Sequence, residues 1–323
     1  MLQFSARPFA TLLTICMSFS PAFAQYGAKT AKPYTQADID YGRKEQARID
    51  SQRSEYAAAK IEKQAAEPFH IVGDLYWVGI HNWGSALIKT SEGLILIDTS
   101  WNETAPLVAA DIEKLGFKLT DVKIILMTEY HGDHNAGVAY FKEKTGAKVM
   151  VMGPDAPLVE KGGNNYPPAK VDRVLKDRDT VKLGNKTLTA YFIPGHTPGS
   201  TTWYWQETEN GVTYNVADVC CWFTPNNVVT DPENPTEQLR KNWQVLKSLP
   251  VDIPFPGIHA YHFDTWTKYD RMKKGEKMPW IDPQGYRGVI AAFEQDFEDK
   301  VKQQLKDGPP PPRQGRGGPP PVR

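Results

Sequence analysis

The sequence lacks an excess of charge of either sign, because 38 Lys and Arg residues balance 38 Asp and Glu residues. No net field therefore draws the chain to nucleic acid or to an anionic membrane, and we expect a small molecule as its substrate. Long hydrophobic runs are also scarce. After the first 25 residues no stretch approaches the roughly 20 apolar residues that a transmembrane helix needs. With 40% hydrophobic and 24% charged residues, the composition is that of an ordinary globular protein.

The first 24 residues predict a secretory signal peptide. They contain an early arginine, an apolar run from about Phe9 to Phe19, and the sequence AFA of a cleavage site at 22–24. The apolar run is too short to span a bilayer. Cys16 lies in this segment without the small residue expected before a lipidated cysteine, which argues against a lipoprotein. We therefore expect an exported, periplasmic protein with no membrane attachment after cleavage.

A polar extension at 25–66 is expected to follow the signal peptide and to contain one long helix. Thr35 is followed three residues later by Asp38, as in a capping box at the start of a helix. The apolar positions of this segment form only a thin stripe, which predicts weak packing on the domain or on a partner. At the other end of the chain, residues 307–323 are rich in proline and glycine and are expected to be disordered.

Between residues 67 and 306 the pattern predicts one α/β domain. Short β-rich runs come first, separated by Gly and Ser turns, and strands then alternate with helices twice over. This order suits two sheets sandwiched between helices, an αββα sandwich. Strands are expected in 69–80, 85–90, 94–100, 122–128, 147–153, 186–193, 201–206, 213–217 and 251–255. Helices are expected at about 105–115, 135–144, 235–248, 264–275 and 284–305.

Histidine is scarce, yet four of the seven histidines stand in loops that directly follow apolar strands. His131 and His134 follow VKIILMT, His196 follows TAYFIPG, and His259 follows VDIPFPGI. Loops at strand ends are where α/β scaffolds present reactive groups. Glu129 and Asp133 stand in the same loop as the first pair, EYHGDHNAG, so the residue types and their number favour a metal site.

These motifs resemble those of a known family. From about Glu67 to Leu305, the chain is similar to metallo-β-lactamase-fold hydrolases, and more narrowly to subclass B3 metallo-β-lactamases. The resemblance is carried by GDLYWVG, LILIDTS, EYHGDHNAG, YPPAKVDRVLKDRD, PGHTPGSTTW and HAYHFD. It implies two Zn(II) ions and hydrolysis of the β-lactam amide bond by a metal-bound hydroxide, an activity that confers antibiotic resistance.

The resemblance also implies a ligand set. Glu129, His131 and His196 would hold the first zinc, and Asp133, His134 and His259 would hold the second. Asp133 would in addition orient the attacking nucleophile. The alternative for the last ligand is His262, three residues further on, whereas neither His70 nor His81 is expected to bind metal.

Glu129 departs from the family pattern, which has histidine at the first position of His-x-His-x-Asp-His. A carboxylate oxygen binds zinc at about 2.0 to 2.2 Å, much as an imidazole nitrogen does, so glutamate can fill the position. Some members of the subclass carry glutamine or glutamate here. The added negative charge is expected to weaken the Lewis acidity of the first zinc. In the alternative, Glu129 points away and one zinc is lost.

Two further residues, Trp83 and Cys221, are expected to contact the substrate. Trp83, in a turn between two early strands, either lines the site and covers a hydrophobic face of the substrate or packs against the sheet. Where the family places serines that hold the substrate carboxylate, this chain has Cys220 and Cys221, and Cys221 is the expected substrate contact. The two cysteines could instead form a vicinal disulfide, remain buried thiols or bind metal.

Asp218 keeps a second function open, because glyoxalase and lactonase relatives bridge their metals with an aspartate at this strand end. The alternative for Asp218 is a cap of the turn. The second candidate activity is therefore hydrolysis of lactones or thioesters by a protein of the same fold. A third possibility is an interaction protein whose degraded metal site has no catalytic role.

Overall fold

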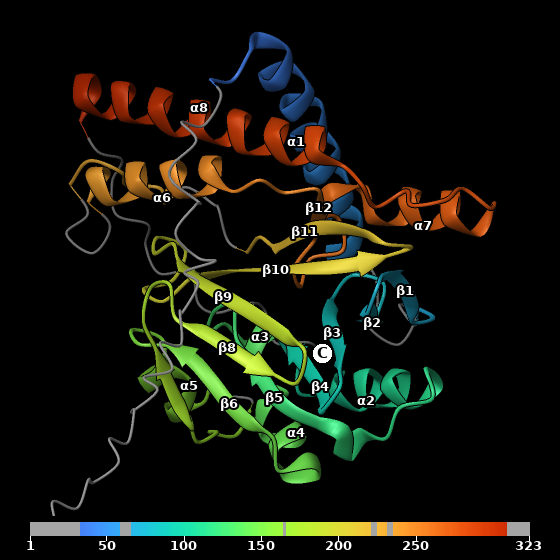
Figure 1. Ribbon diagram of the computed structural model, residues 1–323. Helices are drawn as coiled ribbons and strands as arrows, with labels where there is room; N and C mark the ends of the chain where they lie inside the picture. Colours follow the sequence, from blue (N-terminus) through green and yellow to red (C-terminus); the bar gives the residue numbers. More distant parts are fainter. Residues whose placement is uncertain (1–32, 59–65, 164–165, 221–224, 231–234, 309–323) are drawn as a thin grey trace, which may run out of the picture.

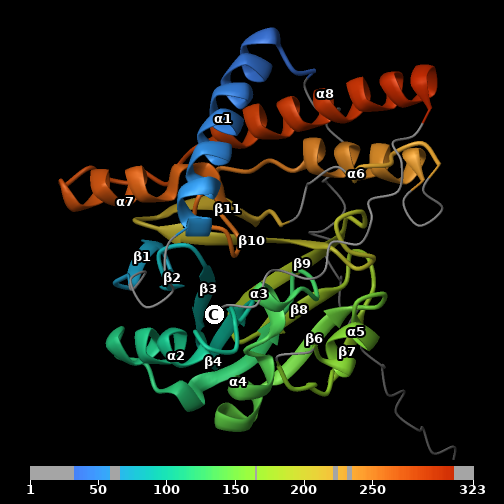
Figure 2. The ribbon, with the colours of Figure 1, turned by 180° about the vertical axis from the view of Figure 1, so that it is seen from behind.

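Two β-sheets face each other, and helices cover the outer face of each, as Figures 1 and 2 show. The computed structural model describes residues 33–58, 66–163, 166–220, 225–230 and 235–308. The four layers confirm the αββα sandwich expected from the sequence. The signal peptide and nearly all of the proline-rich tail fall outside the described residues, so both remain predictions. Within the described ranges, no helix has the length and apolar character to cross a membrane.

The first sheet contains β1 (Phe69–Val72), β2 (Leu75–Gly79), β3 (Gly84–Thr90), β4 (Gly93–Ile97), β5 (Val122–Leu126), β6 (Lys148–Met152) and β7 (Arg173–Leu175), in that order. The strands from β1 to β4 are antiparallel, and those from β4 to β7 are parallel. β4 and β5 are almost wholly apolar because they are central and buried on both faces.

The second sheet contains β8 (Thr180–Leu183), β9 (Lys186–Phe192), β10 (Thr201–Glu209), β11 (Val212–Asp218) and β12 (Ile253–Phe255). Its order is β12-β11-β10-β9-β8, and only β11 and β12 are parallel. Trp203 and Trp205 of β10 point into the space between the sheets, where they pack with Ile88 and Ile97 of the first sheet. Alternation along β10 thus builds the central core.

The helices are α1 (Gln36–Ala58), α2 (Ala105–Lys114), α3 (Gly132–Asn135), α4 (Val138–Thr145), α5 (Ala156–Lys161), α6 (Thr236–Ser248), α7 (Thr265–Lys273) and α8 (Pro283–Asp307). Two single turns, η2 (Leu119–Asp121) and η3 (His262–Asp264), precede β5 and α7. α2, α4 and α5 cover the first sheet, and α6 and α8 cover the second.

Helix α1 crosses α8 on the outside of the second sheet (Figure 2). The capping box is confirmed, because the Thr35 amide donates to Asp38 Oδ2 at 2.8 Å and the Asp38 amide donates to Thr35 Oγ1 at 3.2 Å. A Cβ on Gly42 would lie 1.8 Å from the carbonyl oxygen of Gly288. The helices therefore approach through two glycines rather than through a broad apolar face. The described part of the expected helix is α1, Gln36–Ala58, and the remainder of that prediction falls on residues 59–65, outside the described residues.

Three short elements and one break were not predicted. α5, β7 and β8 have three to six residues each, too few to show a hydrophobic period. The helix expected at 135–144 is two helices, α3 and α4, separated at Ala136 and Gly137. A Cβ on Gly137 would lie 2.5 Å from the Thr99 carbonyl oxygen, so the chain passes close to the end of β4 at this point. The other predicted helices and strands are confirmed within a few residues.

Candidate metal centre

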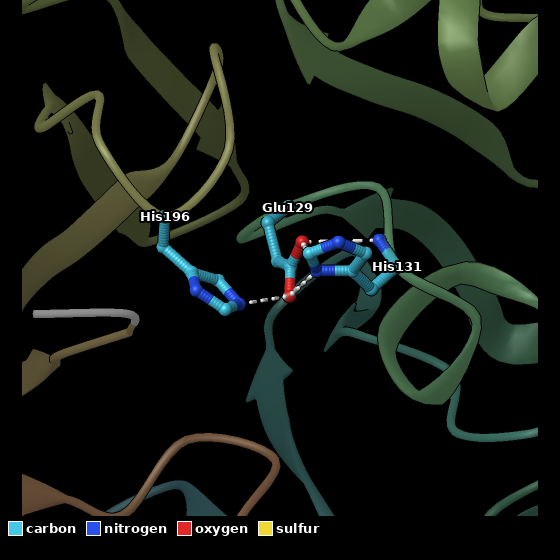
Figure 3. Close-up of side chains that lie close together, drawn as sticks. All are labelled: Glu129, His131 and His196. Atoms are coloured by element: carbon cyan, nitrogen blue, oxygen red, sulfur yellow. Dashed lines mark hydrogen bonds and ion pairs between the residues drawn. The ribbon is translucent and has the colours of Figure 1, made fainter. Parts of the chain in front are cut away.

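Six side chains from three loops form two adjacent groups, each with the donor atoms of a metal site. The first group is Glu129, His131 and His196, and the second is Asp133, His134 and His259. Within each group the candidate ligand atoms lie within 4.8 Å of one another. The structure thus brings together all six residues that the sequence analysis selected. Figure 3 shows the first group, with Glu129 between the two imidazoles.

The loop after β5 is fixed by hydrogen bonds from the facing sheet. The Thr201 amide of β10 donates to the Thr128 carbonyl at 2.8 Å, and the Trp203 indole donates to the Met127 carbonyl at 3.1 Å. Inside the loop, the side-chain amide of Asn135 donates to the Tyr130 carbonyl. Because β10 also follows the turn that carries His196, these bonds hold the loops of the first group next to each other.

Glu129 points into the centre and is only 1% exposed, so the alternative in which it points away is wrong. Its Oε2 lies 2.7 Å from His131 Nδ1, and its Oε1 lies 3.4 Å from His196 Nε2. The same Oε1 lies 3.1 Å from His134 Nε2, which belongs to the second group. Glu129 therefore stands at the junction of the two groups.

The charges in the centre are strongly coupled. Burial would raise the pKa of the Glu129 carboxyl, but the imidazoles of His134, His131 and His196 hold that pKa well below its usual value. Burial would likewise lower the pKa of His134, yet the carboxylates of Glu129, Asp98 and Asp133 raise it to about 10. Buried carboxylates that stabilise a nearby positive charge in this way also favour the binding of a divalent cation.

Asp98 orients His134 through the ring nitrogen that faces away from the centre, and this role was not predicted from the sequence. Its Oδ2 lies 2.8 Å from His134 Nδ1 and accepts the Thr128 hydroxyl at 2.5 Å. Its Oδ1 accepts the Thr128 amide at 2.9 Å. A carboxylate on the far nitrogen of a histidine fixes the tautomer, which leaves Nε2 facing the centre as a donor atom. The position of Asp98 at the end of the apolar run LILI was the available signal.

Asp155, which was also not predicted, holds the turn that carries His196. It accepts the Thr197 hydroxyl and the Gly199 amide, both at 2.7 Å. Burial raises the pKa of Asp155 to about 6, although these two hydrogen bonds lower it. Asp155 precedes α5, a short helix that was not predicted, so nothing in the local sequence pointed to a contact with the His196 turn.

His259 lies in the loop between β12 and η3, with Nε2 3.7 Å from Asp133 Oδ2. Burial lowers the pKa of His259 well below its usual value, which favours the neutral imidazole that a metal requires. The ring of Tyr261 stacks on the His259 ring, with centroids 5.1 Å apart and planes 13° apart. His262, the alternative ligand, instead directs Nδ1 to the Pro256 carbonyl at 3.1 Å and belongs to neither group.

Trp83 lies beside the second group. Its backbone pairs with that of His259 in an isolated bridge, and the adjacent Gly84 amide donates to the Ile258 carbonyl at 2.9 Å. The half-buried Trp83 ring meets the ring of Trp101 edge on, with centroids 5.9 Å apart. Trp101 in turn lies against Gly132, at the start of α3. Aromatic rings thus border the centre on the side of the β2–β3 turn, where Trp83 was expected.

Asp218 and Cys220 follow each other closely at the end of β11. Asp218 is 1% exposed, and among the described residues its Oδ1 has no hydrogen-bond partner, so it caps no turn within that part of the chain. Burial raises the pKa of Asp218 well above its usual value, and the nearby charge of Asp98 adds to the effect. Cys220 is disulfide-bonded and therefore offers no thiolate ligand. Cys221 lies outside the described residues, so its substrate contact remains a prediction.

The donor set fits zinc. Zn(II) takes both imidazole nitrogens, which are borderline donors, and carboxylate oxygens, which are hard donors. Each group offers three such donors and so leaves a fourth tetrahedral position for another ligand. An open position is the mark of a catalytic rather than a structural zinc site. Two such groups joined by Glu129 resemble the two-metal sites of hydrolytic enzymes.

Comparisons with known proteins agree with this geometry. The family model described as "Metallo-beta-lactamase superfamily" matches residues 85–209. The native FEZ-1 metallo-beta-lactamase of Legionella gormanii is 36% identical, with a TM-score of 0.71 over 75% of this chain and 98% of that chain. BJP-1, a subclass B3 metallo-beta-lactamase of Bradyrhizobium japonicum, is 32% identical, with a TM-score of 0.69 over 76% of this chain and 97% of that chain.

Curated relatives carry a different name. A hydroxyacylglutathione hydrolase of Cereibacter sphaeroides is 31% identical over 159 residues, which are 49% of this chain and 55% of the relative. A protein of the same name from Rhodopseudomonas palustris is 41% identical over 95 residues, 29% of this chain and 32% of the relative. The chain therefore spans about half the length of the first and about a third of the second.

Proposed function

Because this chain belongs to the metallo-beta-lactamase superfamily, we propose that it is a zinc-dependent hydrolase that cleaves the amide bond of β-lactams. One observation favours a β-lactam over a thioester as the substrate. The match to the β-lactamase of Legionella gormanii covers 98% of that protein at 36% identity, whereas the match to the hydroxyacylglutathione hydrolase of Cereibacter sphaeroides covers only 55% of that protein. Elements outside the metal loops shape the substrate site, so similarity over the whole domain weighs more than similarity around the ligands.

In the proposed centre, the two groups already described would each hold one zinc ion. Zinc in such a site activates water for attack and polarises the carbonyl of the substrate. Asp133 is the more exposed of the two carboxylates, with 18% of its side chain accessible, against 1% for Glu129. It can therefore accept a hydrogen bond from water and orient that water, while Glu129 acts only as a ligand. Trp83 would cover an apolar face of the substrate.

The test combines zinc content with hydrolysis, measured on the same purified protein. We expect about two zinc ions per chain and hydrolysis of a carbapenem or a cephalosporin that a chelator abolishes and added zinc restores. Hydrolysis of neither β-lactam at full zinc occupancy would refute the proposal. Binding of little zinc, with no hydrolysis of any substrate, would favour the alternative of an interaction protein with a degraded site.

Thioester hydrolysis is the second candidate, and Asp218 is the observation that favours it. This carboxyl lies near His134, and its buried Oδ1 has no hydrogen-bond partner in the part of the chain that the structure describes. A buried polar atom without a partner costs about 1 to 3 kcal/mol, and a metal ion would remove that cost. The name of the curated relatives makes a hydroxyacylglutathione thioester the matching substrate.

Substitution Asp218→Asn separates the two candidates. If Asp218 is a neutral buried acid in a β-lactamase, Asn matches its shape and charge, so zinc content and β-lactam hydrolysis should change by less than about threefold. If Asp218 bridges the metals of a thioesterase, loss of the carboxylate should lower metal affinity at least about tenfold and reduce hydrolysis of a hydroxyacylglutathione with it. Zinc content and both hydrolysis rates are the measurements.

We further propose that the protein works in the periplasm after removal of residues 1–24. The proposal rests on the apolar run and the AFA sequence at 22–24. The mass of the protein recovered from a periplasmic extract tests it, because cleavage after Ala24 leaves Gln25 as the first residue.

A further inference from the structure

Helix α1 reaches the loop that carries His259, although it lies far outside the segment that matches the family model. Arg48, near the middle of α1, donates from Nη1 to the Tyr261 carbonyl at 3.1 Å. The same nitrogen lies 3.6 Å from Asp264 Oδ1. One guanidinium from the N-terminal helix thus bridges two points of the loop that follows His259.

The guanidinium is fixed within its own helix. Glu45, one turn earlier, accepts from Arg48 Nη2 at 2.7 Å, and Gln52, one turn later, accepts from Nη1 at 2.7 Å. Only 21% of the Arg48 side chain is exposed. A planar group with donors held on several sides loses little entropy when it binds the loop, so Arg48 presents a preorganised contact.

The loop needs such support because its backbone is strained. Phe263 has φ 50° and Asp264 has φ 55°, in the left-handed region that residues other than glycine seldom adopt. Two consecutive residues of this kind cost on the order of 1 to 3 kcal/mol each and persist only where the surroundings hold them. Arg48 contacts the carbonyl that precedes this pair and the carboxylate of its second member.

The supported loop connects directly to the metal centre. The ring of Tyr261, whose carbonyl Arg48 binds, stacks on the ring of His259 at 5.1 Å. His259 Nε2 in turn faces Asp133 Oδ2 at 3.7 Å. Two contacts therefore connect Arg48 to the candidate ligand His259: the hydrogen bond to the Tyr261 carbonyl and the stacking of the Tyr261 ring on His259.

Helix α1 is anchored independently of this loop. The Gly42 and Gly288 backbones meet at its crossing with α8, and the Gln46 side-chain amide donates to Asp296 Oδ2 at 2.8 Å. Because α8 packs on the second sheet, the position of Arg48 is set by the body of the domain. The helix can hold the loop without depending on it.

We propose that Arg48 is a positioning residue for the second zinc site, which acts through Tyr261 to hold His259 in place for the metal. The proposal rests on the proposed function only in taking the two groups as zinc sites. It gives the N-terminal helix a role in metal binding and predicts an effect at one site but not at the other.

The test is a stepwise zinc titration of the metal-free protein against a chromophoric chelator. Arg48→Met keeps an aliphatic side chain and removes the hydrogen-bond donors. Arg48→Lys keeps the positive charge but lacks the planar guanidinium group. Arg43→Met, at an exposed position of the same helix, is the matched control. His259→Ala identifies which binding step belongs to the second site. Thermal unfolding of each metal-free variant reports on the fold separately.

We expect Arg48→Met to weaken the step assigned to His259 by about 10- to 100-fold, the usual effect of losing a residue that orients a ligand. The other step should stay within about threefold of the wild type, Arg48→Lys should recover part of the loss, and Arg43→Met should change neither step. Unchanged affinity in Arg48→Met, or an equal loss at both steps, would overturn the proposal.

The titration does not depend on catalysis. A protein that binds two zinc ions but hydrolyses no β-lactam would refute the proposed activity and leave the role of Arg48 open to the same measurement. A wild type that binds a single zinc ion, whose affinity His259→Ala leaves unchanged, would overturn the role of Arg48, since the site it positions would not bind metal.

Discussion

At the scale of single residues, Glu129 is the most informative position. It replaces the histidine expected from the family pattern, yet it is buried and in contact with three imidazoles. A carboxylate without a partner in such a location would turn towards solvent or become protonated, because burial of an unpaired charge costs free energy. The surrounding imidazoles instead hold the pKa of Glu129 well below its usual value, against the effect of burial. The exchange therefore alters the centre and does not abolish it.

Substitution of Glu129 tests this interpretation. Glu129→Ala should reduce zinc from about two ions to about one per chain and lower β-lactam hydrolysis at least tenfold, since one group keeps only two donors. Glu129→His should retain both ions and hydrolyse at least as fast as the wild type, because a neutral ligand leaves the metal a stronger Lewis acid. Elemental analysis and initial rates measure both effects. Two zinc ions in Glu129→Ala would mean that Glu129 is not a ligand.

Asp98 should matter as much as a ligand although it binds no metal in the proposed centre. Asp98→Asn keeps the size of the side chain but removes the charge that fixes the His134 tautomer. We expect zinc affinity to fall about 10- to 100-fold, as measured by competition with a chelator. An unchanged affinity would show that His134 keeps its orientation through Thr128 alone, which lies 2.8 Å from His134 Nδ1.

At the scale of elements, the turn between β9 and β10 depends on Asp155, and this makes its stability sensitive to pH. The folded protein raises the pKa of Asp155 to about 6, from an ordinary 3.8. The folded state therefore favours the protonated carboxyl. Stability from this residue is fully present below about pH 4 and is lost as pH rises through about 6. The difference corresponds to about 3 kcal/mol.

Asp155→Asn should flatten this dependence. The unfolding free energy of metal-free wild-type protein should fall more steeply between about pH 4 and about pH 7 than that of the variant, by up to about 3 kcal/mol. Urea unfolding of both proteins at the two pH values gives the comparison, and the remaining titrations cancel in the difference. Parallel curves would contradict the raised pKa of Asp155.

The crossing of α1 and α8 makes a prediction for a second element. A methyl group on Gly42 has no room, so Gly42→Ala should push the helices apart and lower the free energy of unfolding by about 1 to 3 kcal/mol. Gly153→Ala is the control, because the nearest heavy atom to its Cβ would be 3.5 Å away. Chemical denaturation of both variants measures the effect. Equal stability of the two would show that α1 does not dock as described.

At the scale of the whole molecule, the sequence was informative wherever a pattern extends over several residues or a motif has a family meaning. The apolar runs of β4 and β5, the loop around His131 and the turn around His196 were identifiable, and the structure confirms that they converge. Asp98 and Asp155 were not assigned, because each contributes through a contact with a distant loop. Local sequence does not encode such partners.

The N-terminal helix illustrates the same limit. Its thin apolar stripe predicted weak packing, but its close approach to α8 depends on the absence of side chains at Gly42 and Gly288. Periodicity of apolar residues cannot reveal a contact of this kind. Nor could it reveal that Arg48 faces the loop after His259, more than 200 residues away.

The central claim is that both groups bind zinc, with Glu129 as a ligand. Anomalous diffraction at the zinc absorption edge, from crystals of the zinc-loaded protein, tests it most directly. We expect two peaks, one among Glu129, His131 and His196 and one among Asp133, His134 and His259. A single peak at the second group, with the Glu129 carboxylate out of bonding distance of any metal, would contradict it.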